Sequence, residues 1–275
     1  MEINKLRRQA VKLILFCSIF LFGQCSKEDA TSSQAITTQE SIPAEPEVWV
    51  FLMAGQSNMA GRDEVEKIDS NGNQNILSIN EAGEVITAKE PLHFYEPDFA
   101  GLDCGLSFAQ TIIDNAPDDT KILMIPTAVG GSRIDQWIDD EEHRGVKLLS
   151  NFESKAKLAR EQGIIKGILW HQGEGNANSG EIENYQSKLA TLFTKFRNIV
   201  NNEELTIMIG ELGSFSTNQA DWDRINSEIN NYANTDNNAH VISTEDFNDL
   251  GDDLHFNSAA QRKMGERFAL EFLSQ

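Results

Sequence analysis

Three side chains of this 275-residue sequence could together attack an ester or a similar acyl bond: Ser57, Asp252 and His255. A serine hydroxyl is a poor nucleophile until a base takes its proton, and a carboxylate must orient that base. Asp252 and His255 stand three residues apart in a turn-like segment, where residues at that separation approach closely. The carboxylate can then reach Nδ1 of His255 and leave Nε2 for Ser57, which predicts nucleophilic catalysis by a Ser-His-Asp unit.

Each of these assignments has an alternative. Ser57 could instead cap the next helix, because serine is a favoured N-cap residue. Asp253 is a second carboxylate near His255, but at two residues' separation it is expected to point away. His171 is the alternative base, because it ends a predicted strand. We favour a structural interpretation of His171, as a buried histidine that holds the turn at Gln172 by hydrogen bonds.

The tetrahedral oxyanion of acyl transfer needs preorganised hydrogen-bond donors. Three neighbouring loops supply candidates: the backbone N–H of Ser57, the backbone N–H of Gly131 and the side-chain amide of Gln172. The pair Gly130-Gly131 favours this, because glycine lets a backbone N–H point freely into a site. These donors are the predicted oxyanion hole.

Five further residues are candidates for contact with the substrate. They lie beside the nucleophile, in the connection 62–104 or after the third strand, and they are Gln56, Asn58, His93, His171 and Glu174. His171 and Glu174 could be taken for a metal pair, but no third ligand stands at a telling spacing, so no metal and no other cofactor is expected. Cys104 is interpreted as a small buried apolar residue.

The positions of these residues follow from the elements before them. The apolar run 49–53 reads as a strand buried on both faces, and the turn that carries Ser57 comes directly after it. Four more strands are expected at residues 122–125, 164–170, 205–209 and 241–242. Helices are expected between and after them at residues 106–115, 148–162, 182–200, 222–232 and 259–273. This alternation predicts a three-layer α/β/α sandwich with a five-stranded parallel sheet, whose carboxyl edge holds every polar cluster.

The connection 62–104 is long for a loop. It contains a hairpin signal, because the runs 75–80 and 84–87 stand on either side of the turn Glu81-Ala82-Gly83. An insertion of this length beside the nucleophile is expected to be functional.

Composition limits the partners. The net charge is −20, which argues against nucleic acid and against charge-driven binding to anionic membranes. A hydrophobic content of 40% in 275 residues suffices for one sizeable core. We interpret the negative charge as a well-solvated acidic surface without a specific function.

The N-terminus has the pattern of a targeting segment. Basic residues precede an apolar stretch at 13–22 that is too short for an ordinary transmembrane helix. With Cys25 after it, this resembles a bacterial lipoprotein signal. We therefore expect a signal peptide at 1–24, a lipidated Cys25, a flexible tether at 25–47 and the enzyme domain at 48–275. The protein would be exported and held at the outer membrane, facing the cell surface or the periplasm, with the lipid as its only membrane contact; an ordinary secretory signal cut nearby is the alternative.

Four blocks in order resemble the SGNH hydrolase superfamily, which has a flavodoxin-like fold: Gly55–Met59, Gly130–Ser132, His171–Glu174 and Asp252-x-x-His255. The closest match is the branch of sialate O-acetylesterases and acetyl xylan esterases. This resemblance covers most of the chain from Val48 onward. It implies that Gln172 takes the side-chain oxyanion role and that the substrate is an acetylated glycan, such as xylan or O-acetylated sialic acid. The sequence departs from the branch at Gly175-Asn176, where Ser-Asp is frequent, and this leaves substrate specificity open.

From the residues alone the sequence predicts a serine hydrolase, an esterase, with no named substrate. Two other functions stay open. One is a non-catalytic carbohydrate-binding surface lipoprotein, which a missing catalytic element would reveal, and none is missing. The other is a lipase or thioesterase of the same superfamily, which would need an apolar groove for a long acyl chain.

Overall fold

The computed structural model describes residues 47–70 and 72–275. The predicted signal peptide, Cys25 and nearly all of the predicted tether lie outside the described residues. Within the described part, no helix is both long enough and apolar enough to cross a membrane.

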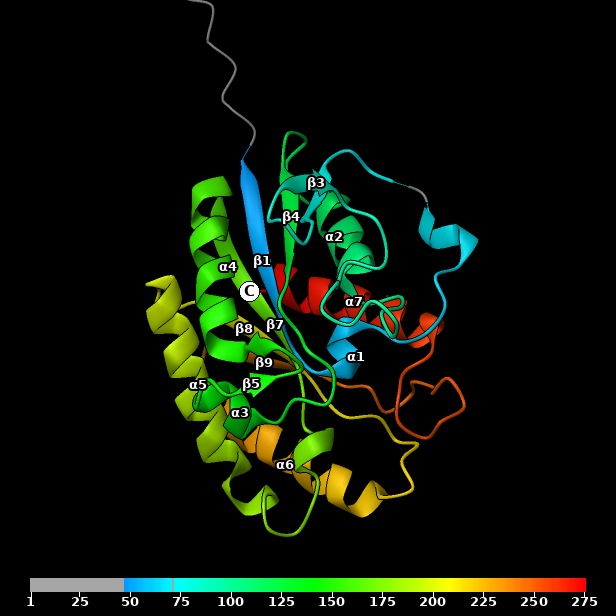
Figure 1. The fold of residues 1–275 in the computed structure, drawn as a ribbon, viewed down its shortest axis with the longest axis vertical. Coiled ribbons are helices and arrows are strands. Elements are labelled where there is room, and N and C mark those ends of the chain that lie inside the picture. Colours follow the sequence, from blue (N-terminus) through cyan, green and yellow to red (C-terminus); the bar gives the residue numbers. More distant parts are fainter. Residues whose placement is uncertain (1–46, 71) are drawn as a thin grey trace, which may run out of the picture. The chain divides into compact units, whose positions relative to one another are not determined.

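A seven-stranded sheet forms the centre of the domain, in the order β3-β2-β4-β1-β7-β8-β9 (Figure 1). Five of its strands are the predicted parallel ones, and their bounds are β1 (Val48–Gly55), β4 (Lys121–Pro126), β7 (Ile164–His171), β8 (Thr206–Gly210) and β9 (Ala239–Ile242). The predicted count of five is wrong, because the hairpin of β2 (Ile76–Ile79) and β3 (Val85–Thr87) joins the same sheet.

The hairpin joins the sheet for a physical reason. β2 pairs in parallel with β4, with Ile76 opposite Ile122, and both ends of β2 are buried. Without β2, the edge of β4 would expose unpaired backbone groups, and folded proteins normally cover such edges. Docking of β2 covers this edge and leaves β3, an antiparallel strand with all three residues exposed, at the rim.

Helices cover both faces of the sheet, as predicted for the three-layer α/β/α sandwich (Figure 1). One layer contains α2 (Gly105–Ile113) and α7 (Ser258–Leu273). The other contains α3 (Ile134–Ile138), α4 (Leu148–Gln162), α5 (Tyr185–Val200) and α6 (Gln219–Ala233). Short pieces complete the described fold: α1 (Ser57–Ala60), the 3-10 turns Lys67–Ser70, Glu174–Asn176 and Ile182–Asn184, and the small ladder β5 (Glu142–His143) with β6 (Val146–Lys147).

β1 is the strand from which both cores are built. Its side chains alternate between the faces of the sheet, as in any strand. Val50 and Leu52 enter the core beneath α3–α6, whereas Phe51 and Met53 enter the core beneath α2 and α7. All four are fully buried, so an uninterrupted apolar run is what this position requires.

β1 also marks the place where the chain changes direction across the sheet. It pairs with β4 on one side and with β7 on the other, and in open α/β sheets ligands bind at the carboxyl ends of strands beside such a switch point. The fold therefore places the turn after β1 at the centre of the functional edge.

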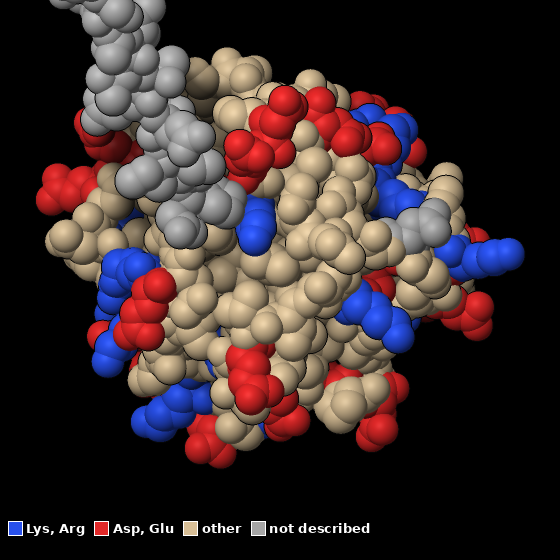
Figure 2. Space-filling model, turned by 90° about the horizontal axis from the view of Figure 1, so that it is seen from above, with Lys and Arg blue, Asp and Glu red and all other residues tan. Residues whose placement is uncertain are grey.

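The surface charge is spread out on the face shown in Figure 2. Among the described residues drawn on that face, Lys and Arg side chains stand between Asp and Glu side chains around a largely uncharged centre. The negative net charge is thus offset locally by scattered cations on this face.

Candidate active site

Ser57 lies at the first position of α1, directly after the turn that ends β1. The turn is sharp because Gly55 has φ +137° and packs against the backbone of His171, where an added Cβ would stand 2.0 Å from the carbonyl oxygen. The N–H of Gln56 then donates to the same oxygen at 3.0 Å. Ser57 is only 5% exposed, so the turn presents its hydroxyl in a confined place.

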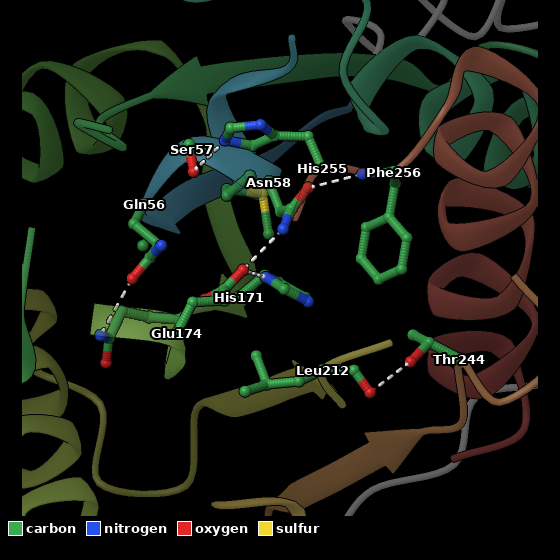
Figure 3. A network of polar contacts seen from close by, with 12 residues as sticks. Gln56, Ser57, Asn58, His171, Glu174, Leu212, Thr244, His255 and Phe256 are labelled. Atoms are coloured by element: carbon green, nitrogen blue, oxygen red, sulfur yellow. Dashed lines mark hydrogen bonds and ion pairs between the residues drawn. The ribbon is translucent and has the colours of Figure 1, made fainter. Parts of the chain in front are cut away.

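The structure brings Ser57, His255 and Asp252 into one hydrogen-bonded chain, of which Figure 3 shows the contact between Ser57 and His255. Nε2 of His255 lies 3.0 Å from the hydroxyl of Ser57, and Nδ1 lies 2.6 Å from Oδ2 of Asp252. Asp253 has φ +58° and its N–H donates to Asp249, so it takes no part. This is the geometry that the sequence predicted from the separation of Asp252 and His255.

The local electrostatics keep Asp252 ionised. Partial burial would raise the pKa of its carboxyl, but the N–H groups of His255 and Leu254 and the His255 ring outweigh this and lower the pKa. Oδ1 accepts the N–H of Leu254 at 3.0 Å and that of His255 at 2.8 Å, while Oδ2 is left for the ring. A carboxylate held in this way fixes the ring so that Nε2 faces Ser57.

A cleft of about 820 Å³ opens over the nucleophile. Its walls come from five segments of the chain, and the lining residues are Gln56, Ser57, Arg62, Asp63, Glu64, Val65, Asp98, Phe99, Ala100, Gly101, Gly130, Gly131, Arg144, Glu174, Gly175, Leu250, Asp252, Leu254 and His255. Eight of these belong to the connection 62–104, which therefore forms one wall of the cleft, as expected of an insertion beside the nucleophile.

Gly131, whose backbone N–H is a predicted donor of the oxyanion hole, lines this cleft with φ +71°. The neighbouring Gly130 donates its N–H to Glu96 instead. Glu96 also pairs with Arg62, with 2.8 Å between Nη2 and Oε2, and with Arg144. Burial would raise the pKa of Glu96, but Arg62, the Gly130 N–H and Arg144 lower it. The glycine loop is therefore pinned by an ionised carboxylate between two guanidinium groups.

The predicted role of Gln172 in the oxyanion hole needs correction. Its side chain is fully buried and does not line the cleft. Nε2 donates to Asn176 at 2.9 Å and to Gln56 at 3.1 Å, and Oε1 accepts the hydroxyl of Tyr185 at 2.9 Å. Both ends of the amide are thus engaged inside the protein, and Gln172 braces Gln56 rather than facing the nucleophile.

The predicted substrate-binding residues divide into two groups. Gln56 and Glu174 line the cleft, whereas His93, His171 and Asn58 do not. His93, which is part of the insertion 62–104, is buried, with 2.8 Å between its Nδ1 and Oδ2 of Asp103. Its predicted contact with substrate is therefore corrected, because the buried carboxylate draws the ring inward. Asn58 is taken up below.

His171 is fully buried at the end of β7, and its Nε2 lies 2.9 Å from the carbonyl oxygen of Glu211. Its Nδ1 lies 3.7 Å from Glu174. Neither ring atom reaches the nucleophile, so the structural interpretation of His171 fits better than the role of base. Within residues 47–70 and 72–275, no three His, Cys, Asp or Glu side chains group as metal ligands would.

The functional residues that sequence reasoning missed include Arg62, Phe99 and Arg144 in the cleft lining, and Glu96, which pairs with both arginines behind it. In the sequence, Glu96 is 34 residues from Arg62 and 48 residues from Arg144, so no local spacing revealed the cluster. The one available signal was the length of the connection that carries three of them.

Comparison with known proteins places the chain in a family. The model of the family "carbohydrate esterase, sialic acid-specific acetylesterase" matches residues 47–274. The chain belongs to this family of carbohydrate acetylesterases, and it is therefore a carboxylic ester hydrolase. The resemblance to SGNH-type sialate O-acetylesterases that the sequence blocks indicated is confirmed at the level of the family.

Individual relatives agree with this. The chain is 26% identical over 247 residues to the probable carbohydrate esterase At4g34215 of Arabidopsis thaliana, over 82% of this chain and 90% of that protein. The X-ray structure of that plant protein superposes with a TM-score of 0.74 at 24% identity, over 84% of this chain and 99% of that one. NanS superposes with a TM-score of 0.67 at 16% identity, over 85% and 98% of the two chains. XAC1771, a carbohydrate acetylesterase from Xanthomonas citri, gives 0.63 at 17% identity, over 82% and 55%. The superpositions support the α/β fold with its mostly parallel sheet.

Proposed function

We propose that the protein removes O-acetyl groups from a carbohydrate through an acyl-enzyme formed on Ser57. The observation that carries the proposal is the 3.0 Å approach of His255 Nε2 to the Ser57 hydroxyl at the base of a solvent-open cleft. A nucleophile, its base and the carboxylate that orients the base are then all in reach of one ester.

The reaction follows from these contacts. His255 takes the hydroxyl proton as Ser57 Oγ attacks the acetyl carbon, and the N–H groups of Ser57 and Gly131 stabilise the resulting oxyanion. The ester bond then breaks, and the sugar oxygen leaves with the proton from His255. Water, deprotonated by His255, attacks the acetyl-serine, and acetate leaves as Ser57 regains its proton. Asp252 stays ionised throughout and stabilises the imidazolium in both halves.

The cleft favours an uncharged glycan as the substrate. Four apolar side chains on its rim are exposed to solvent, namely Val65, Phe99, Leu250 and Leu254. Phe99 is 61% exposed and could stack on the apolar face of a sugar ring, since few large apolar side chains stay exposed without a binding role when they gather in one patch.

The charged side chains that line the cleft also favour an uncharged glycan as the substrate. Five carboxylates line the cleft: Asp63, Glu64, Asp98, Glu174 and Asp252. Only two cations face them, and both Arg62 and Arg144 are already paired with Glu96. An anionic sugar such as sialate would meet net repulsion here, so we favour neutral acetylated polysaccharide over O-acetylated sialic acid. A panel of acetylated glycans, measured by acetate release, tests the choice; faster release from O-acetylated sialate than from acetylated xylan would contradict it.

The esterase should be selective for short acyl groups. Ser57 is nearly buried, so each added methylene must enter a confined site, and one misplaced methylene typically changes a rate by about tenfold or more. We expect kcat/KM on p-nitrophenyl butyrate to be at least about a hundredfold below that on the acetate. Comparable rates on acetyl and octanoyl esters would instead support the lipase alternative, and no activity on any ester would support the binding lipoprotein.

We further propose that the protein is exported and anchored through lipid on Cys25. The proposal rests on the basic and apolar segments before that residue. Several acyl chains on one cysteine would anchor stably, whereas a single chain binds only marginally. Mass spectrometry of the membrane fraction should show an N-terminal peptide beginning at acylated Cys25. A mature N-terminus at another position, or a free Cys25 thiol, would refute the anchor.

A further inference from the structure

Asn58 makes two hydrogen bonds that lie on either side of His255 in the chain, and Figure 3 shows the one to Phe256. Its Nδ2 donates to the carbonyl oxygen of Leu254 at 3.1 Å, and its Oδ1 accepts the N–H of Phe256 at 2.9 Å. The side chain is 1% exposed and does not line the cleft. One amide therefore grips the backbone immediately before and immediately after the base.

The other side of the Asn58 amide rests on Glu174. Nδ2 also donates to Oε1 of Glu174 at 2.6 Å, and that oxygen lies 3.7 Å from Nδ1 of His171. The Glu174 side chain is 3% exposed. This buried carboxylate settles the orientation of the amide, because Glu174 and the Leu254 carbonyl both require a donor while the Phe256 N–H requires an acceptor.

The segment that carries His255 needs such support. Residues 250–254 are exposed, and Gly251 and Asp253 both have positive φ. Exposed segments of this kind open locally at low free energy. Regular secondary structure resumes with α7, which Asn257 caps.

We propose that Asn58 is a positioning residue that holds His255 in line with Ser57, and that Glu174 fixes the Asn58 amide for this purpose. The substrate-contact role that the sequence predicted for Asn58 is replaced by this one. Ser57 and Asn58 are consecutive residues, so the turn after β1 positions the nucleophile directly and the base through Asn58. We call the Asn58–Glu174 pair the clamp. The inference rests on the proposed function of Ser57 and His255.

The main test is Asn58→Leu, which keeps the approximate size and removes both backbone hydrogen bonds. The matched control is Asn226→Leu, because the Asn226 amide grips Leu212 in the same way, with its N–H at 2.7 Å and its carbonyl at 2.9 Å, but away from His255. Both variants lose two hydrogen bonds to backbone, but Asn58→Leu also loses the bond to the buried Glu174 carboxylate, so it should lose more thermal stability than Asn226→Leu. Only Asn58→Leu should also lose kcat, by about a hundredfold with KM within about threefold, because the base is misplaced by a fraction of an ångström or more.

A charge exchange covers the case in which Asn58→Leu does not fold. Asn58→Asp keeps the acceptor for Phe256 but places a carboxylate against Glu174, so it should lose more activity than Glu174→Gln. In the double variant the glutamine amide can donate to the new aspartate, and activity should recover at least about tenfold over Asn58→Asp. The Leu254 carbonyl still lacks its donor, so recovery should stay incomplete.

A fluorophosphonate probe gives a second readout, since its rate of labelling reports the activation of Ser57 without any acetyl substrate. If the probe labels the wild-type enzyme but the enzyme deacetylates no glycan, the proposed function is refuted, whereas the positioning role of Asn58 is not. The positioning role of Asn58 is refuted if two rates of the folded Asn58→Leu enzyme lie within about threefold of those of Asn226→Leu. These are the rate of labelling by the probe and kcat on an acetyl ester. The role of the clamp is equally refuted if the double variant is no faster than Asn58→Asp.

Discussion

Ser57→Ala should lower kcat/KM on an acetyl ester by about 10⁶-fold, and His255→Ala should lower it by about the same factor. The hydroxyl and the imidazole act in one proton transfer, so neither contributes without the other. The double variant should therefore be about as slow as either single variant. The residual rate would come from binding and from the backbone donors at Ser57 and Gly131.

Asp252→Asn should cost less, about 10⁴-fold, because it leaves the base in place but favours the wrong imidazole tautomer. Asp252 is 38% exposed at its side chain, so solvent can replace part of its effect. The lowered pKa of Asp252 also has a consequence for pH. Its carboxylate is lost only as the pH falls through that lowered pKa, below the range where a histidine gains its proton. Protonation of Asp252 should therefore make no contribution to the acid limb of kcat/KM until the pH reaches that lowered pKa.

The measurement compares purified Ser57→Ala, Asp252→Asn, His255→Ala and His171→Ala, each shown to be folded by circular dichroism. His171→Ala is the critical comparison, since it tests the alternative base. A folded His255→Ala enzyme with near wild-type activity beside an inactive, folded His171→Ala enzyme would show that the base is wrongly assigned.

Gly55→Ala should destabilise the domain by about 3–5 kcal/mol, because two penalties combine. The residue has φ +137°, which side chains other than glycine's rarely adopt, and the new Cβ would stand 2.0 Å from the backbone oxygen of His171. β1 and β7 resist moving apart here, because they pair without a break from Phe51 opposite Gly167 to Gly55 opposite His171. Activity should fall as well, since Ser57 follows two residues later.

Gly72→Ala is the control for this substitution. A Cβ at Gly72 meets no atom within 4 Å, so the free energy of unfolding should change by no more than about 0.5 kcal/mol. Urea unfolding of both variants gives the comparison. Equal midpoints for Gly55→Ala and wild type would mean that the turn tolerates a side chain and that the contact with His171 does not hold it.

Patterns among neighbouring residues were enough to predict those parts of the site whose residues are close together in the sequence. The apolar run of β1 predicted a doubly buried strand, and the three-residue separation of Asp252 and His255 predicted their contact. The alternation of strands and helices along the chain was also enough to predict the central parallel strands, because a helix between two strands lets the second strand run in the same direction as the first.

Features that depend on a distant partner could not be predicted in this way. A hairpin pattern describes the pairing of β2 with β3 but carries no information about the edge of β4, to which β2 binds. The direction of an amide is set by its neighbours, and those of Gln172 include Tyr185 of α5 and Gln56 from the turn after β1. The same holds for His93, whose sequence position suggested the cleft while Asp103 holds it in the interior.

The two ends of the Ser57–His255 hydrogen bond are 198 residues apart in the chain. A ribosome adds about 5–20 residues per second, so the nucleophile is made roughly 10–40 s before its base. The last helix, α7, is then needed to complete the support, because Gln261 donates to the carbonyl oxygen of Asn58 at 2.8 Å. A nascent or C-terminally truncated chain therefore carries a serine without a base. Hydrolysis by this enzyme therefore reports that synthesis has passed His255 and that α7 has docked.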